Sequence, residues 1–150
     1  MRSVVRRTWR KVGEGDYEAA VAMAAPGVRF RFVGDTALGA DVRGQEAFRA
    51  WFVRFTAHLP GVRLKLVDVV ANGWPWNTRV AVCLQVVGTL RDGTPYRNIA
   101  MQWITLRWGR MVDDVVVEDT LRLDAALRRF PAPVPRLTRL AFPGTGARED

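Results

Sequence analysis

The sequence predicts an α+β fold in which a few helices close over a strongly curved antiparallel sheet and leave an interior pocket for a small, largely apolar molecule. Most segments before residue 60 carry apolar side chains at helical spacing, whereas the stretches between residues 62 and 119 are β-type and separated by short turns. Two of these stretches exceed ten residues, and strands of that length fit one small domain when the sheet twists and bends strongly. A bent sheet has a concave face that helices can cover.

Two short helices are expected to open the chain. Val5, Trp9 and Val12 are spaced at i, i+4 and i+7, so they form one apolar stripe, and two glycines directly after them end this helix. A second helix is expected over Tyr17–Ala24, because Asp16 before it is a suitable N-cap and a Pro-Gly pair follows it.

A strand and a third helix are expected next. Arginine and phenylalanine alternate over Val28–Val33, which is the pattern of a half-buried strand. The glycine-punctuated stretch 34–44 predicts a loop. Gln45–His58 then predicts a helix, because aromatic side chains recur at helical spacing and Leu59-Pro60-Gly61 ends it. These aromatic residues, most of them expected in the core, are Phe48, Trp51, Phe52 and Phe55.

Four strands and a last helix complete the domain. The expected strands are Val62–Ala71, Arg79–Leu90, Tyr96–Trp108 and Met111–Asp119. Their connections are short, so sequential pairing gives an antiparallel meander. Thr120 is a suitable cap for a final helix over Leu121–Phe130. We therefore predict one domain over residues 1–130 and an extended or disordered tail over residues 131–150.

Composition narrows the classes of function. The net charge is +8, but the basic residues are nearly all arginines spread along the chain, so we expect no nucleic-acid partner. Binding of nucleic acid through the basic first helix is a further alternative. Cys83 is the only cysteine, so no intrachain disulfide is possible. No run of about 18 uncharged apolar residues occurs, and the basic N-terminus lacks the apolar stretch of a signal peptide. We expect a cytoplasmic protein with no membrane partner.

Three stretches carry a resemblance to a known family. They are TWRKVGEGDYEA, residues 28–52 with the helix entry Gly44–Phe48, and WGRMVDDVVVEDTLRLDAAL. Together with the order of elements, they resemble the SnoaL-like polyketide cyclases of the nuclear transport factor 2-like superfamily, over residues 5–128. The resemblance implies a cone-shaped α+β barrel open at one end. It also implies intramolecular aldol ring closure of a polyketide by an aspartate that acts as acid and base, without a metal.

Activities vary within this superfamily, so individual residues have to discriminate between them. The catalytic residues of its ketosteroid isomerases are replaced in this sequence. Four catalytic residues of its limonene epoxide hydrolases are replaced as well, by Phe30, Phe32, Gln85 and Val87. Asp119 matches the cyclase aspartate. The histidine that assists it in the family has no counterpart, because the single histidine, His58, ends the third helix, where it suits the helix dipole.

Strand alternation predicts the composition of the pocket. If Asp119 points inward, Val115 and Val117 do so too, and Asp114, Val116 and Glu118 point outward. By the superfamily analogy, the inward residues of the two neighbouring strands are Ala81, Cys83, Gln85, Val87, Asn98, Ala100 and Gln102. The pocket then holds one carboxylate and three amides between aromatic walls, which is typical of small-molecule sites. The walls are Phe30, Phe32, Trp51 and Phe55, and Tyr17 is a candidate at the mouth.

A carboxylate in such a pocket supports acid–base chemistry. Loss of hydration raises its pKa from ~4 towards neutrality, where it can take and return a proton, while amides donate to a developing enolate. We therefore hypothesise a cofactor-free cyclase or isomerase for a polyketide or similar polycyclic ketone. A non-catalytic small-molecule binding protein of the same fold is the alternative, and capping of the last helix is an alternative role for Asp119.

Three further features bear on partners. Ile99, Met101 and Trp103 form an apolar strip on the outer sheet face, which predicts a homodimer through the sheet. The turn Trp74-Pro75-Trp76 either shields the cavity or packs on a partner subunit. Asp113 and Asp114 are adjacent strand residues that point to opposite faces, with no Cys or His beside them, so no metal site is expected.

Overall fold

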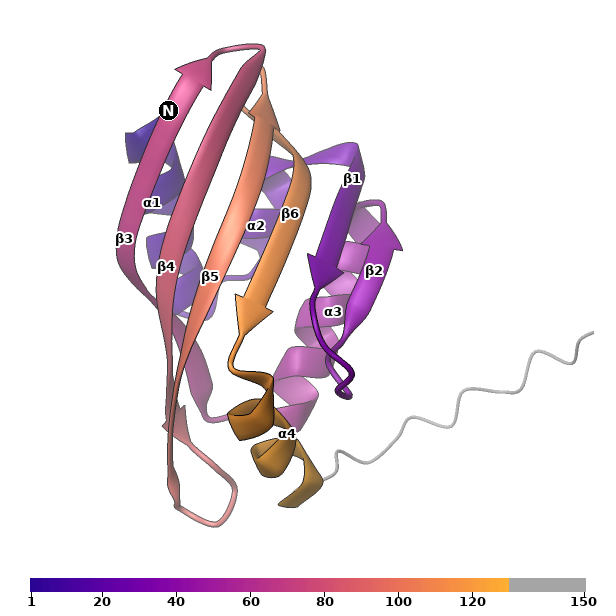
Figure 1. Cartoon of the computed structure of the whole chain (residues 1–150), viewed down its shortest axis with the longest axis vertical. Helices are drawn as coiled ribbons and strands as arrows, with labels where there is room; N and C mark the ends of the chain where they lie inside the picture. The colour runs from indigo at the N-terminus through magenta and orange to yellow at the C-terminus, as the bar shows by residue number, and fades with distance from the viewer. Residues whose placement is uncertain (130–150) are drawn as a thin grey trace, which may run out of the picture.

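The computed structural model describes residues 1–129 and contains one six-stranded sheet with three helices behind it and a fourth at its end (Figure 1). The elements are α1 (Arg2–Gly13), α2 (Glu18–Met23), β1 (Ala24–Phe32), β2 (Ala40–Arg43), α3 (Gln45–His58), β3 (Val62–Trp74), β4 (Asn77–Thr89), β5 (Pro95–Arg107), β6 (Arg110–Glu118) and α4 (Thr120–Arg129). Phe130 and the predicted tail, residues 131–150, lie outside the described residues.

The strands follow the order β2-β1-β6-β5-β4-β3. The pair β1–β6 is parallel and all other neighbours are antiparallel. The predicted α+β fold with a curved meander is confirmed. Shifts in register between Leu66 and Asp68 and between Thr105 and Leu106 contribute to the curvature, because a bulge bends a strand and increases its twist.

The expected loop over residues 34–44 contains the short strand β2, which the sequence prediction missed. Four residues are too few to show an alternating pattern, and β2 is held by its pairing with β1, in which Phe30 lies opposite Val42. The second helix is also shorter than predicted, because β1 already begins at Ala24. Pro26 therefore lies inside a strand, at the position where the register with β6 shifts, and proline is tolerated there.

The core lies between the concave face of the sheet and the helices. The apolar stripe of α1 is buried as predicted, with Trp9 only 2% exposed. The aromatic stripe of α3 is buried too and faces β1. No helix within residues 1–129 is long and apolar enough to cross a membrane.

Candidate functional site

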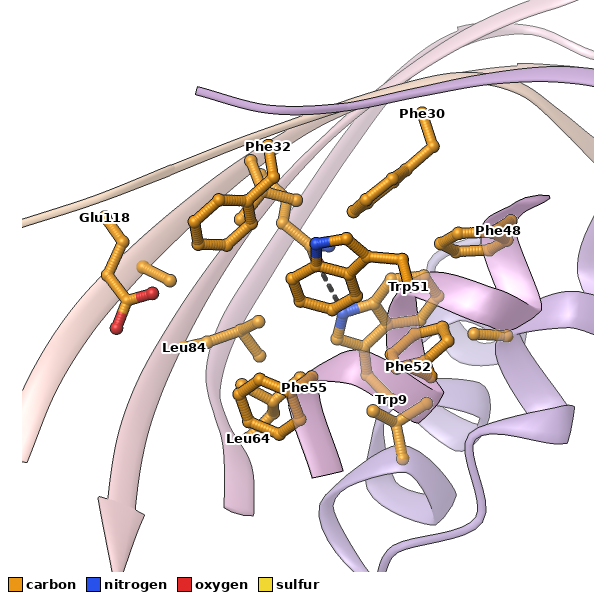
Figure 2. A pocket seen from close by; sticks show the side chains of 15 residues that line it. Trp9, Phe30, Phe32, Phe48, Trp51, Phe52, Phe55, Leu64, Leu84 and Glu118 are labelled. Carbon is orange, nitrogen blue, oxygen red and sulfur yellow. Dashed lines mark hydrogen bonds between the residues drawn. The ribbon is translucent and has the colours of Figure 1, made fainter. Parts of the chain in front are cut away.

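An aromatic cavity lies between the concave sheet face and the helices α1 and α3 (Figure 2). The centre of a water molecule can occupy about 20 Å³ of this cavity, so the free space holds about one water. The remaining space is filled by rings, so a ligand with several rings can enter only after these side chains move apart.

Trp51 is the centre of this aromatic wall. Its ring lies 5.0 Å from Phe30, 5.1 Å from Phe32 and 5.5 Å from Phe55, measured between ring centroids. Its indole N–H donates to the main-chain oxygen of Leu38 at 2.8 Å, which fixes the orientation of the ring. The four aromatic residues predicted for the pocket walls therefore lie together.

Asp119 is exposed and does not enter the cavity, so the prediction that it points inward is wrong. Its Oδ1 accepts the backbone N–H of Arg122 at 3.3 Å, and it thereby caps the start of α4. The register explains the error. Val116 lies opposite Gln102 on β5, and residues directly opposite each other share a face, so the inward residues of β6 are Asp114, Val116 and Glu118.

The predicted inward side of β4 is also wrong. Gln85 is exposed, whereas its neighbours Leu84 and Val86 are buried opposite Ala100 and Asn98. The expected set Ala81, Cys83, Gln85 and Val87 therefore belongs to the outer side of the strand. On β5 the prediction is confirmed, since Asn98, Ala100 and Gln102 are all buried.

Two other candidates lie outside the cavity lining. Tyr17 is half-buried and stacks on Phe52 with ring centroids 4.8 Å apart, and it does not line the cavity. His58 is half-buried at the end of α3, where burial, with the charges of Arg54 and Arg91, lowers the pKa of its imidazole. Neither is placed to act on a group inside the cavity.

Glu118 supplies the carboxyl group of the cavity, at the end of β6. Its side chain is 8% exposed and lies beside Phe32 and Leu84 (Figure 2). The hydroxyl of Tyr96 donates to its Oε1 at 3.3 Å, and the amide of Asn98 donates to the Tyr96 oxygen at 3.0 Å. Burial raises the pKa of Glu118 to about 7.

A second polar group lies further along the same face. The indole N–H of Trp9 donates to the oxygen of Gln102, and the Gln102 amide donates to Oδ2 of Asp114 at 3.4 Å. Because an indole N–H can only donate, Trp9 determines which way the Gln102 amide points. Asp114 is 0% exposed, and its Oδ1 has no hydrogen-bond partner among the described residues. Burial, with the charge of Asp113 adding to it, raises the pKa of Asp114 to about 8.

Glu118 and Asp114 are well separated along β6. They are four residues apart on one strand, so their α-carbons lie about 13 Å apart at the usual rise per residue. At neutral pH, Glu118 is partly ionised and can take or return a proton, whereas Asp114 is mostly protonated. Among residues 1–129, no three His, Cys, Asp or Glu side chains are grouped so that they could hold a metal ion.

A match to a family model identifies the family to which the chain belongs. The family model described as the SnoaL-like domain matches residues 5–114. The chain belongs to the SnoaL-like domain family. No protein with a curated functional description matches this SnoaL-like chain significantly.

Solved structures share the fold of this SnoaL-like domain. An NTF2-like protein of unknown function from Burkholderia pseudomallei has 20% identity and a TM-score of 0.72, and the match covers 87% of this chain and 96% of that one. TerC, co-crystallised with polyporic acid, has 19% identity and a TM-score of 0.71, with 84% and 96% covered. IdmH from Streptomyces antibioticus, a candidate polyketide cyclase, has 19% identity and a TM-score of 0.66, with 84% and 96% covered. At these identities the likeness shows the fold alone.

Proposed function

We propose that this SnoaL-like protein is a cofactor-free cyclase or isomerase for a polyketide or similar polycyclic ketone, with Glu118 as the acid and base. The observation that carries the proposal is the position of Glu118, a carboxyl group with a pKa of about 7 at the side of an aromatic cavity. The catalytic role expected of Asp119 thus passes to its neighbour.

The proposed chemistry uses one proton carrier twice. The Glu118 carboxylate removes a proton from a carbon beside a ketone, and the electron pair of that C–H bond forms an enolate. The enolate carbon bonds to a second carbonyl carbon of the same molecule, and Glu118 returns the proton to the oxygen of that carbonyl. The Gln102 amide lines the cavity and has a second N–H besides the one that it donates to Asp114, so it can stabilise negative charge on the oxygens, which is a large part of catalysis in a site that excludes water. Both N–H groups of Asn98 are already donated, to Tyr96 and to the main chain of Asp119.

Substrate entry requires the aromatic wall to open. The apolar body of the substrate would replace the contacts that Phe30, Phe32, Trp51 and Phe55 now make with one another. Binding energy from this large apolar surface offsets the cost of separating the rings.

Proton abstraction can be tested without knowing the natural substrate. A panel of polyketide-derived ketones is incubated with the protein in D₂O, and deuterium incorporation beside the carbonyl is followed by NMR. We expect Glu118→Gln to lower the exchange rate by about a hundredfold or more. Asp119→Asn is the matched control and should exchange at the wild-type rate. Equal exchange in wild type and Glu118→Gln would contradict the assignment.

A non-catalytic binding protein is the second candidate, and the predominantly apolar lining of the cavity favours it. It predicts ligand binding that Trp51→Ala weakens and Glu118→Gln leaves unchanged, with no deuterium exchange above the uncatalysed rate. Ligand affinity and exchange measured on the same variants separate the two candidates.

We further propose that the protein is a cytoplasmic homodimer formed through the outer sheet face. Ile99, Met101 and Trp103 on β5 and Val117 on β6 are each 49–54% exposed and form one apolar strip. The unpaired Cys83 fits a reducing compartment. Met101→Glu should convert the dimer to a monomer in light scattering, whereas Val53→Glu on the exposed side of α3 should not.

A further inference from the structure

Three exposed tryptophans gather at one end of the sheet. Trp74 and Trp76 lie at the β3–β4 turn, and Trp108 lies at the β5–β6 turn; we call this group the tryptophan tip. Their side chains are 68%, 55% and 73% exposed. Trp74 stacks on Trp76 with centroids 5.6 Å apart, and Trp108 lies 6.2 Å from Trp76. None of the three lines the aromatic cavity, so they do not shield it.

The tip is held in place by hydrogen bonds to main-chain oxygens. The N–H of Trp108 donates to the oxygen of Pro75 at 2.6 Å, which joins the two turns. The Thr78 hydroxyl donates to the oxygen of Trp74 at 2.9 Å and fixes the first turn. The three indoles therefore form an ordered apolar surface.

The fold does not require an indole at position 108. Trp108 has a φ of 51°, a left-handed conformation that is unfavourable for bulky side chains, and Gly109 follows with a φ of 76°. Hairpin turns of this kind favour Asn-Gly, so asparagine would suit the backbone better. Trp108 contributes exposed apolar surface at a conformational cost, which points to a role outside the fold.

The surroundings of the tip are cationic. Arg107 and Arg110 lie opposite each other on both sides of the Trp108-Gly109 turn. Arg79 lines a groove with Trp74, and Arg2 lines another with Pro75. The segments 1–4, 72–79 and 105–112, which build this end, contain no Asp or Glu, and Asp113, which follows on β6, is paired with Arg31. The partner of the tip is therefore anionic and amphipathic.

We propose that the tryptophan tip docks the protein on the surface of bilayers that contain anionic phospholipids. Indoles favour the headgroup level of a bilayer, and arginines are attracted to its negative surface. The tip lies at the opposite end of the sheet from α4 and the end of β6, so docking leaves the Glu118 end free (Figure 1). The sequence prediction of no membrane partner rested on the lack of a spanning segment, and surface docking needs none.

Vesicle sedimentation of the full chain tests the proposal. We expect the protein to sediment with vesicles of mixed phosphatidylglycerol and phosphatidylcholine, and to be released by salt, because screening weakens the attraction. Pure phosphatidylcholine should retain much less. Arg107→Gln with Arg110→Gln should weaken binding to anionic vesicles by about 25-fold, at roughly fivefold for each arginine.

Matched variants locate the contact. Trp108→Asn, which suits the turn, and Trp76→Ala should each lower binding, whereas Leu121→Ala on exposed α4 should not. Arg54→Gln with Arg91→Gln, at the far end, is the control for the loss of two charges. Circular dichroism checks that every variant is folded.

Four outcomes would overturn the proposal. The first is that the wild type does not sediment with anionic vesicles, and the second is that tip and control variants sediment equally. The third is a wild type that does not bind vesicles but dimerises through the tip. The fourth is a protein that binds a single-stranded oligonucleotide in place of vesicles.

Discussion

Glu118 and Asp119 are adjacent at the end of β6 and face opposite environments. Glu118 is buried at the aromatic cavity and accepts a hydrogen bond from the Tyr96 hydroxyl, whereas Asp119 is exposed and caps α4 through the N–H of Arg122. Strand alternation followed by a helix start produces this division. One carboxyl group is thereby available for chemistry and the other stabilises the structure.

The cap predicts the effect of shortening Asp119. Asp119→Ala should lower the free energy of unfolding by about 1 kcal/mol, because the N–H of Arg122 loses its acceptor. Asp119→Asn should retain most of the stability, since an amide oxygen can also accept. Urea denaturation measures both variants, and a loss that is equal in the two would argue against the capping role.

The two buried acids predict a stability that falls as the pH rises. The folded pKa is raised to about 7 for Glu118 and about 8 for Asp114, from ordinary values of 4.5 and 3.8. Folding therefore favours their protonated forms, and the stability is fully present below the ordinary values and is lost as the pH rises through the folded ones.

Asp114→Asn should remove much of this dependence. Above pH 8 the variant should be more stable than the wild type, because the amide cannot ionise. Urea denaturation as a function of pH provides the measurement, with Asp35→Asn at an exposed carboxyl group as the control. Parallel curves for wild type and Asp114→Asn would show that Asp114 titrates normally.

Trp9 is predicted to position Gln102. Trp9→Phe removes the indole N–H and leaves the buried oxygen of Gln102 without its donor, which should cost about 1–3 kcal/mol of unfolding free energy. Combining it with Gln102→Leu should cost less than the sum of the two single changes, because the unsatisfied oxygen is also removed. Full additivity in the double-mutant cycle would contradict the contact.

Trp51 is predicted to be the most sensitive residue of the wall. Trp51→Ala should destabilise the protein by about 3–5 kcal/mol and weaken ligand binding, because four aromatic neighbours lose their contacts. Trp51→Phe should lose less of both, since a ring remains. Thermal unfolding and ligand titration of the two variants measure the difference.

The sequence predicts the element order well but not which side of every strand faces inward. Apolar periodicity locates α1 and α3. The inward residues of β5 follow from the family resemblance, because its buried side carries Asn98 and Gln102 while its exposed side is apolar. In β6, Val115, Val116 and Val117 are apolar on both faces, so alternation has no preferred side. The pairing of Gln102 with Val116 settles it, and such a register depends on contacts between distant segments.

The ionisation of Glu118 is the most direct test of the proposed site. A titration of the protein labelled with ¹³C at glutamate carboxyl groups, with Glu118→Gln to assign the signal, gives its pKa. A value near 7 is expected from burial in the cavity. A value near the ordinary 4.5 would mean that the carboxyl group is hydrated and would contradict the site.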